Sequence, residues 1–373
     1  MSFKTDLVTS RWLQRTYSLA TNSENEEWPP STNTSEPLRE AKFTCRIEWT
    51  QALRWSNKNR FHGFSIFDIS YIDYAGDWVT EADLVDIDLF EQFRERINGA
   101  HALLGIIDGI RLRRYLENDK GGLEFFQRQL RPVVDAMRGQ PKPMHFIVTK
   151  WDVLSGYSLQ DIASVLLGAK DTGFYNLVET RTVRRRNGQA DVGEVRLIPV
   201  SAVGNFASLE PDWRVSKAKG REPSHLNVEI PLVAAMLDVC DLALAIKLQE
   251  AERASGHAAR REGLVSRAGD TEQGNVTLGP LGVTISLRYV IGFALEAGFG
   301  AATLLGKPTG ALGRRMRRLY RRIRALEIEG VRSEEAALLY AARILRERLR
   351  EFDTDSAHDG SRLIASVEAD VLP

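Results

Sequence analysis

The stretch MHFIVTKWD, residues 144–152, decides the fold because it joins a short apolar run to a polar motif. Its first six residues are almost continuously apolar, which is typical of a strand buried on both faces of a sheet. The motif Thr149-Lys150-Trp151-Asp152 begins where that strand ends. Ligands bind beyond the carboxyl ends of strands in open α/β sheets, so the position predicts a binding role for the motif.

Two further apolar runs, HALLGIID at 101–108 and RLIPVS at 196–201, predict neighbouring buried strands. Helical periodicity appears in the segments around them, at residues 84–98, 121–138, 158–168 and 231–252. This alternation of strands and helices predicts an α/β fold with a mostly parallel sheet and helices on both faces.

The remaining segments up to residue 200 are less regular. Residues 1–20 predict a helix, and the alternating patterns at 42–50 and 63–72 predict half-buried strands. An insertion at 176–194 contains RRRNGQAD, where Asn-Gly favours a hairpin turn.

The chain divides by composition into three parts. Residues 1–254 form the predicted α/β domain, and the polar, glycine-containing residues 255–280 are interpreted as a linker. Residues 281–373 are predicted to be a mainly helical extension. Within it, Ser333 followed by two glutamates marks the start of a helix at 334–352.

The first motif, Asp73-Tyr74-Ala75-Gly76, follows the predicted strand at 63–72. An aspartate at this position can hold a magnesium ion, and Gly76 allows its backbone N–H to approach a γ-phosphate closely. A simple turn is the alternative interpretation of this short pattern.

The other two motifs suit a purine base. The carboxylate of Asp152 can accept hydrogen bonds from guanine N1–H and N2–H, a donor pair that adenine lacks, while the Lys150 stem lies along the base. Ser201-Ala202-Val203-Gly204 begins at the end of the strand at 196–201, and its backbone amides can contact guanine O6. A strand-ending turn with exposed charges is the alternative for Thr149–Asp152.

The order and strand context of these motifs resemble TRAFAC-type P-loop GTPases, of the bacterial kind found as double-GTPase modules in conflict and defence systems. The loop Trp28-Pro29-Pro30-Ser31-Thr32 and the pair Asn227-Val228 are similar to that group. The resemblance covers roughly residues 1–250. It implies GTP or GDP and Mg²⁺ as ligands, contacting these residues: Thr32 or Thr34, Asp73, Gly76, Thr149, Lys150, Asp152, Ser201 and Ala202.

Two departures from the family pattern affect catalysis. Many of these GTPases have a catalytic, water-orienting glutamine directly after DxxG. This chain has Asp77 at that catalytic position, which could bind water but would repel the γ-phosphate. The P-loop GxxxxGK[ST] is missing, and residues 1–27 contain no glycine. We expect either a chain that begins too late or a genuine pseudo-GTPase, with weak hydrolysis unless a longer chain or a partner supplies the phosphate loop.

The carboxyl-terminal part holds two features of another kind. Residues 289–306 are apolar apart from Glu296, and a buried helix or hairpin is preferred over a membrane-inserted segment. Residues 312–326 predict a basic amphipathic helix. It is either an ordinary surface helix or a site for an anionic membrane or an acidic partner.

Composition limits the remaining classes. Fifty basic residues balance fifty acidic ones, so net charge predicts no specific nucleic-acid binding. Two cysteines and no amino-terminal apolar segment predict a cytoplasmic protein, peripheral to the membrane if 312–326 binds lipid. Two functions stay open: a guanine-nucleotide-binding protein, with a second GTPase-like chain as a possible partner, or a non-catalytic interaction protein.

Overall fold

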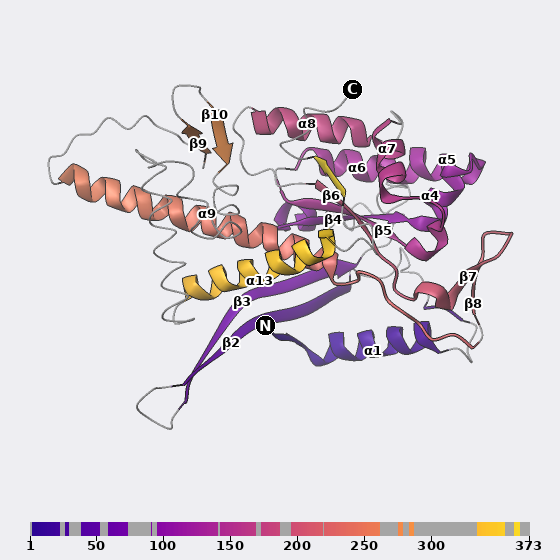
Figure 1. The fold of residues 1–373 in the computed structure, drawn as a ribbon, viewed down its shortest axis with the longest axis horizontal. Helices are drawn as coiled ribbons and strands as arrows, with labels where there is room; N and C mark the ends of the chain where they lie inside the picture. Colours follow the sequence, from indigo (N-terminus) through magenta and orange to yellow (C-terminus); the bar gives the residue numbers. More distant parts are fainter. Residues whose placement is uncertain are drawn as a thin grey trace.

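A computed structural model gives the fold of the chain, and it is drawn as a ribbon in Figure 1. It describes residues 2–22, 27–29, 39–52, 59–73, 91, 95–140, 142–168, 173–186, 195–218, 220–261, 275–278, 283–286, 334–354 and 362–365.

The central sheet contains the three strands that the apolar runs predict. Strands β4 (Leu103–Asp108), β5 (Met144–Thr149) and β6 (Val195–Pro199) are parallel and adjacent. A fourth strand, β11 (Arg362–Ala365), pairs antiparallel with β6 and gives the order β11-β6-β5-β4. The molecule is therefore an α/β protein with a parallel three-stranded centre.

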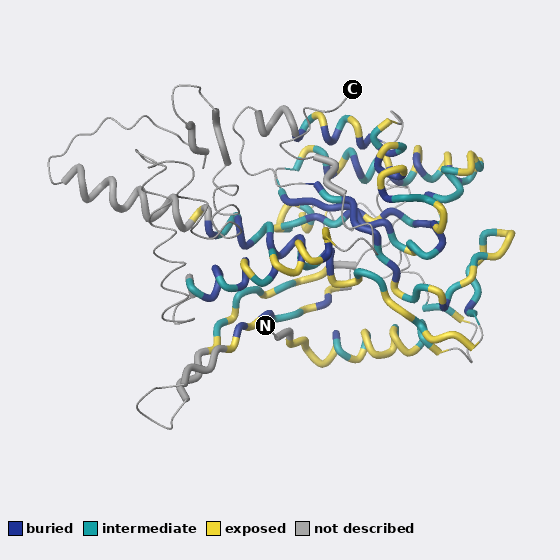
Figure 2. Tube along the Cα trace, in the orientation of Figure 1, coloured by how far each residue is buried: buried dark blue, intermediate teal, exposed yellow. Residues whose placement is uncertain are grey.

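Alternate residues of these strands enter two different hydrophobic cores. Leu197 faces the same core as Phe146, while the next residue, Ile198, faces the other one. Because successive side chains of a strand point to opposite faces, the sheet must be covered on both sides. Figure 2 shows dark blue mainly along the central strands, whereas the helices around them combine buried, intermediate and exposed residues.

Short helices cover the face of the sheet that carries Phe146 and Leu197. They are α4 (Gly109–Leu116), α5 (Lys120–Phe125), α6 (Arg131–Arg138), α7 (Leu159–Gly168) and α8 (Phe174–Arg186). The helix predicted at 121–138 exists, but a π-helical segment at Phe126–Leu130 separates α5 from α6. Pro132 lies in the first turn of α6, where the missing N–H of proline is tolerated.

Two long helices cover the opposite face of the sheet, which carries Ile198. Helix α9 (Ile230–Arg261) packs on β4 and β5, and α13 (Glu334–Thr354) packs on α9. Arg346 Nη2 lies 2.6 Å from Asp241 Oδ2, and both side chains are nearly buried. The predicted boundary after residue 254 falls inside α9, and α13 shares the core of the preceding domain.

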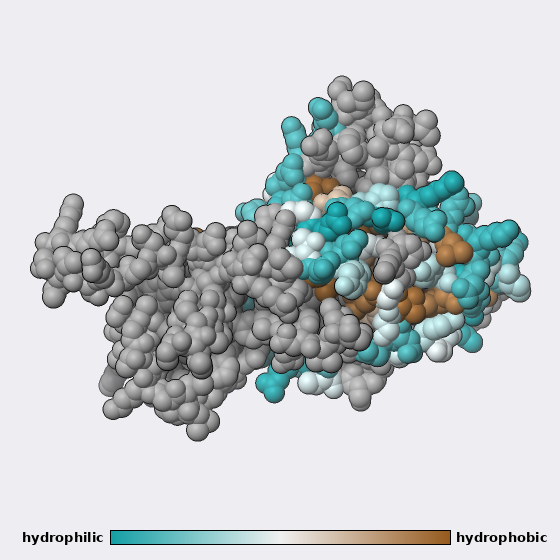
Figure 3. Space-filling view, turned by 90° about the horizontal axis from the view of Figure 1, so that it is seen from above, coloured by the Kyte–Doolittle hydropathy of each residue, from teal (hydrophilic) through white to brown (hydrophobic). Residues whose placement is uncertain are grey.

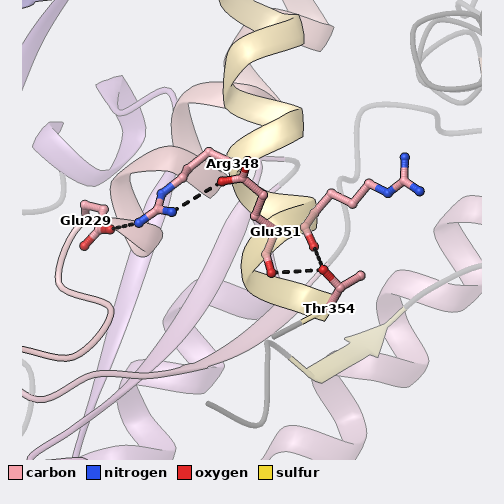
Figure 4. A network of polar contacts seen from close by, with 5 residues as sticks. Glu229, Arg348, Glu351 and Thr354 are labelled. Carbon is pink, nitrogen blue, oxygen red and sulfur yellow. Dashed lines mark hydrogen bonds and ion pairs between the residues drawn. The ribbon is translucent and has the colours of Figure 1, made fainter. Parts of the chain in front are cut away.

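An exposed polar network also joins α13 to the start of α9 (Figure 4). Arg348 donates to Glu229 at 2.6 Å and lies 3.4 Å from Glu351, while the Thr354 hydroxyl donates to the Glu351 carbonyl at 3.1 Å. Burial alone would raise the pKa of Glu229, but the hydrogen bond from Arg348, a backbone hydrogen bond and the charges of Arg348 and His225 together leave that pKa lowered. The network therefore favours the charged carboxylate at this joint.

The amino-terminal strands form a second sheet of their own. Strands β2 (Arg39–Ala52) and β3 (Asn59–Asp73) make a long antiparallel hairpin, and β1 (Ser2–Thr5) pairs with β2. The hairpin extends away from the body in Figure 1, with α1 (Leu7–Thr21) beside it. Among the described strands, β3 and β4 each end their own sheet and do not pair with each other.

The predicted hairpin at 176–194 is wrong over its first half, which forms α8. Phe174, Leu177, Val178 and Arg181 recur at helical spacing and are all buried. The Arg181 guanidinium donates to the carbonyls of Gln140 and Lys142. The buried side chains at helical spacing thus form a helix up to Arg186, while the Asn-Gly pair lies outside the described residues.

A hairpin that the sequence did not predict follows β6, formed by β7 (Ala207–Leu209) and β8 (Val215–Lys217). Strands β9 (Asn275–Leu278) and β10 (Val283–Ser286) form a separate antiparallel pair.

From above, the described surface is largely hydrophilic with separate hydrophobic patches (Figure 3). No helix in the described part of the chain combines the length and hydropathy needed to cross a membrane.

Candidate functional site

The carboxyl ends of the three parallel strands meet at one edge of the sheet. Asp108 is in register with Thr149, and Val148 is in register with Pro199. The residues that follow these strands therefore lie close together, as the sequence predicted. This edge is the usual ligand position in an open α/β sheet.

The Thr149-Lys150 turn has a special backbone conformation. Lys150 has φ 52°, in the left-handed region, and it begins the 3₁₀ helix η2 (Trp151–Leu154). Gly109 lies directly against this turn, since a Cβ there would be 2.3 Å from the carbonyl oxygen of Thr149. Glycine at 109 thus permits close approach of α4 to the turn.

Asp108 organises this turn through both of its carboxylate oxygens. Oδ1 accepts from the backbone N–H of Ile110 and Arg111 and caps α4, while Oδ2 lies 2.5 Å from Lys150 Nζ. Asp108 therefore caps α4 and holds Lys150 at the same time. The ion pair is partly exposed, so it orients the lysine more than it stabilises the fold.

Asp152 is held by Ser201, which links the second and third motifs. The Ser201 hydroxyl donates to Asp152 Oδ1 and accepts from the Gly204 N–H at 2.8 Å. Ser201 is buried, with 1% of its surface exposed. Oδ2 of Asp152 has no hydrogen-bond partner among the described residues, so one carboxylate oxygen is fixed and the other is available to a ligand.

The Ser201–Gly204 loop presents one backbone donor in the same place. The N–H and C=O of Ser201 are both paired with Leu226, at 3.0 and 2.7 Å. The N–H of exposed Ala202 makes no hydrogen bond within the described residues. Gly204, with φ 53°, passes so near Ser224 that a Cβ would lie 2.4 Å from its carbonyl oxygen. The loop is thereby fixed with the Ala202 amide at its exposed turn.

Two cross-links hold the site loops together. The Trp151 N–H donates to the Val200 carbonyl at 3.1 Å, and the Asn227 side chain donates to the Pro199 carbonyl at 3.1 Å. Asn227 has φ 57°, a conformation that asparagine tolerates better than most residues. The base-site residues predicted from sequence, at 149, 150, 152, 201 and 202, are thus gathered by the fold.

The phosphate and magnesium half of the predicted site is not described to the same extent. Asp73 is the last residue of β3, and its strand belongs to the other sheet. Thr32, Thr34, Gly76 and Asp77 lie outside the described residues, as do 289–306 and 312–326. Within the described ranges no three His, Cys, Asp or Glu residues form a group suited to a metal ion. The magnesium site on Asp73 and Thr32 therefore stays a prediction.

Sequence reasoning missed Gly109 and Lys217. Gly109 belongs to no recognisable sequence motif. A glycine directly after a predicted strand is nevertheless a usual place for two backbone segments to approach closely. Lys217 lies in β8 and contacts the end of α1, a contact between residues almost two hundred positions apart.

Comparison with protein-family models, curated proteins and solved structures finds no match.

Proposed function

We propose that this protein binds guanine nucleotide at the carboxyl edge of β4, β5 and β6. One observation carries the proposal: Ser201 fixes Asp152 through Oδ1, which leaves Oδ2 beside a backbone loop whose Ala202 N–H is available. An acceptor and a donor so arranged complement the edge of guanine, where O6 accepts and N1–H and N2–H donate.

Lys150 supports the same assignment. Its ammonium is held 2.5 Å from Asp108, and about half of its side chain is exposed. A lysine stem fixed at its head offers an extended apolar surface on which a base plane can lie. Adenine would leave the Asp152 carboxylate without donors, so the site should discriminate strongly against ATP.

The finer assignment, a TRAFAC-type GTPase-like protein, rests on the order of the three motifs. Hydrolysis belongs to the proposal only with a phosphate loop supplied by a longer chain or a second chain. Asp77 in place of glutamine further predicts slow turnover. The alternative of a non-catalytic interaction protein depends on residues 289–326, so it stays a prediction.

The test is a titration with fluorescent GDP and GTP, with and without magnesium, of the natural sequence and of Asp152→Asn. We expect saturable binding that Asp152→Asn weakens by about 5- to 150-fold, with xanthine nucleotide then preferred, because loss of a bidentate base contact costs about 1–3 kcal/mol. Asp135→Asn removes a partly exposed carboxylate on α6 and serves as the matched control. Equal binding of ATP and GTP, or no binding at millimolar nucleotide, would refute the proposal.

A further inference from the structure

Lys217 makes a buried contact that base recognition does not use. It is 9% exposed, and its ammonium donates to the carbonyl oxygens of Leu19 at 2.6 Å, Asn22 at 3.0 Å and Glu27 at 2.8 Å. Leu19 and Asn22 belong to the end of α1, where the helix dipole favours a cation. Through these three carbonyls, one lysine links the end of α1 to Glu27.

The residue that follows is held by the same strand. The Trp28 indole N–H donates to the Val215 carbonyl at 3.0 Å, and Lys217 Nζ lies 5.0 Å from the centre of the Trp28 ring. Phe206 meets that ring edge-on, with centroids 6.2 Å apart and an interplanar angle of 82°. Trp28 is thus enclosed by two residues of β8 and by the aromatic residue that ends η4 (Gly204–Phe206).

These contacts lead directly to the base site. Phe206 is fully buried two residues after Gly204, and its carbonyl accepts from the Ala218 N–H at 2.7 Å. Figure 1 shows the β7–β8 hairpin beside the carboxyl end of α1. The loop that carries Ala202 and the segment that carries Trp28 are therefore connected through one hairpin.

The arrangement is costly, which argues that the position of Trp28 matters. Burial lowers the pKa of Lys217, opposed in part by the charge of Glu27. A buried ammonium is tolerated only where acceptors satisfy it, and here three carbonyls from separate positions converge on one atom. A neutral side chain could fill the space without defining where residues 19, 22 and 27 must lie.

We infer that Lys217 is a positioning residue that holds the Trp28 segment against the base-binding loop. This inference rests on the proposed function. The chain continues from Trp28 to Thr32 and Thr34, the predicted contacts of the γ-phosphate and magnesium. Lys217 would therefore affect GTP, which has a γ-phosphate, more than GDP, although it touches neither.

The experiment compares Lys217→Met with Lys142→Met in the full chain. Lys142 is a matched control, because its ammonium also donates to two backbone carbonyls, those of Ile97 and Asn98, away from the site. Burial lowers its pKa as well. A third variant, Lys217→Arg, keeps the charge and the donors but not the ammonium geometry.

Two measurements are made on each protein. The first, without nucleotide, is acrylamide quenching of Trp28, taken as the difference from the same protein carrying Trp28→Phe because the chain has seven tryptophans. The second is the dissociation constant for GDP and for GTP. If the segment is correctly placed only about a tenth of the time without its lysine, GTP affinity falls about tenfold.

We expect Lys217→Met to increase Trp28 quenching and to weaken GTP about tenfold while GDP changes less than about threefold. Lys217→Arg should restore part of both effects, and Lys142→Met should change neither. Unchanged Trp28 quenching, or equal loss of GTP and GDP, would overturn the inference. If the natural sequence binds neither nucleotide, the proposed function fails and so does the nucleotide part of the inference. The quenching data then decide separately whether Lys217 holds the segment.

Discussion

Replacing Gly109 with alanine tests whether α4 must lie directly against the Thr149-Lys150 turn. The added Cβ would be 2.3 Å from the Thr149 carbonyl oxygen and 2.8 Å from that of Lys150. Both are backbone atoms, so no side-chain rotation can relieve the overlap. The start of α4 must move from the turn by about 1 Å to restore van der Waals contact.

The expected magnitude combines two opposing effects. Overpacking of a close contact costs about 1–3 kcal/mol. Alanine in place of glycine in the first turn of a helix returns at most about 0.5–1 kcal/mol. We therefore expect Gly109→Ala to lower the free energy of unfolding by about 1–2 kcal/mol. The shift should also lengthen the contact between Asp108 and Lys150 and weaken guanine-nucleotide binding.

Urea unfolding provides the assay, with the midpoint and slope compared across variants. Gly139→Ala is the control, since Gly139 follows α6 with φ −71° and a Cβ there meets no atom within 4 Å. Hydrogen exchange of the amides at 150–153 reports the local change in Gly109→Ala. If Gly109→Ala is as stable as Gly139→Ala, with unchanged exchange, the close-approach reasoning is wrong.

Three further predictions concern charges and thiols. Asp108→Asn should keep the helix cap and change the unfolding free energy by less than about 1 kcal/mol, as measured by urea unfolding, because the ion pair it breaks is partly exposed. Arg346→Met should cost about 3–5 kcal/mol by leaving Asp241 charged in a nearly buried place, and the double variant with Asp241→Leu should recover most of that loss. Burial raises the pKa of the Cys45 thiol to about 11 and also raises the pKa of the Cys240 thiol. In the unfolded state both thiols lose their protons near the ordinary pKa of 9.0, whereas in the folded state they stay protonated at that pH. Stability should thus fall as pH rises from about 9 towards 11, and a thiol reagent at pH 8 should label both cysteines only after urea is added. Labelling of the native protein would contradict this burial.

The apolar runs were sufficient to predict the central strands because a strand buried on both faces has a continuous hydrophobic sequence. Strand β11 was not predictable in this way. Its sequence, RLIA, is too short to distinguish from a loop, and its pairing with β6 is a contact between distant parts of the chain. Helix α8 was missed because a local turn preference at Asn-Gly was given more weight than the spacing of its apolar residues.

The base half of the candidate site was predictable because each motif follows a strand directly, so register alone brings Asp108, Lys150 and Ser201 to one edge. The Lys217 contact was not predictable, since nothing in the β8 sequence indicates which carbonyls its ammonium will meet. Local pattern specifies residues on adjacent parallel strands, whereas contacts between a hairpin and a distant helix depend on tertiary packing.

The pairing of β11 with β6 has a consequence for synthesis of the protein. Strand β6 leaves the ribosome long before its antiparallel neighbour, which begins at Arg362. About 160 further residues must be added first, which takes on the order of ten to thirty seconds at usual translation rates. During that time the outer edge of β6 has no β11 to cover it, and an uncovered strand edge is a template for association with other chains. We therefore expect the nascent chain to depend on chaperones during this interval.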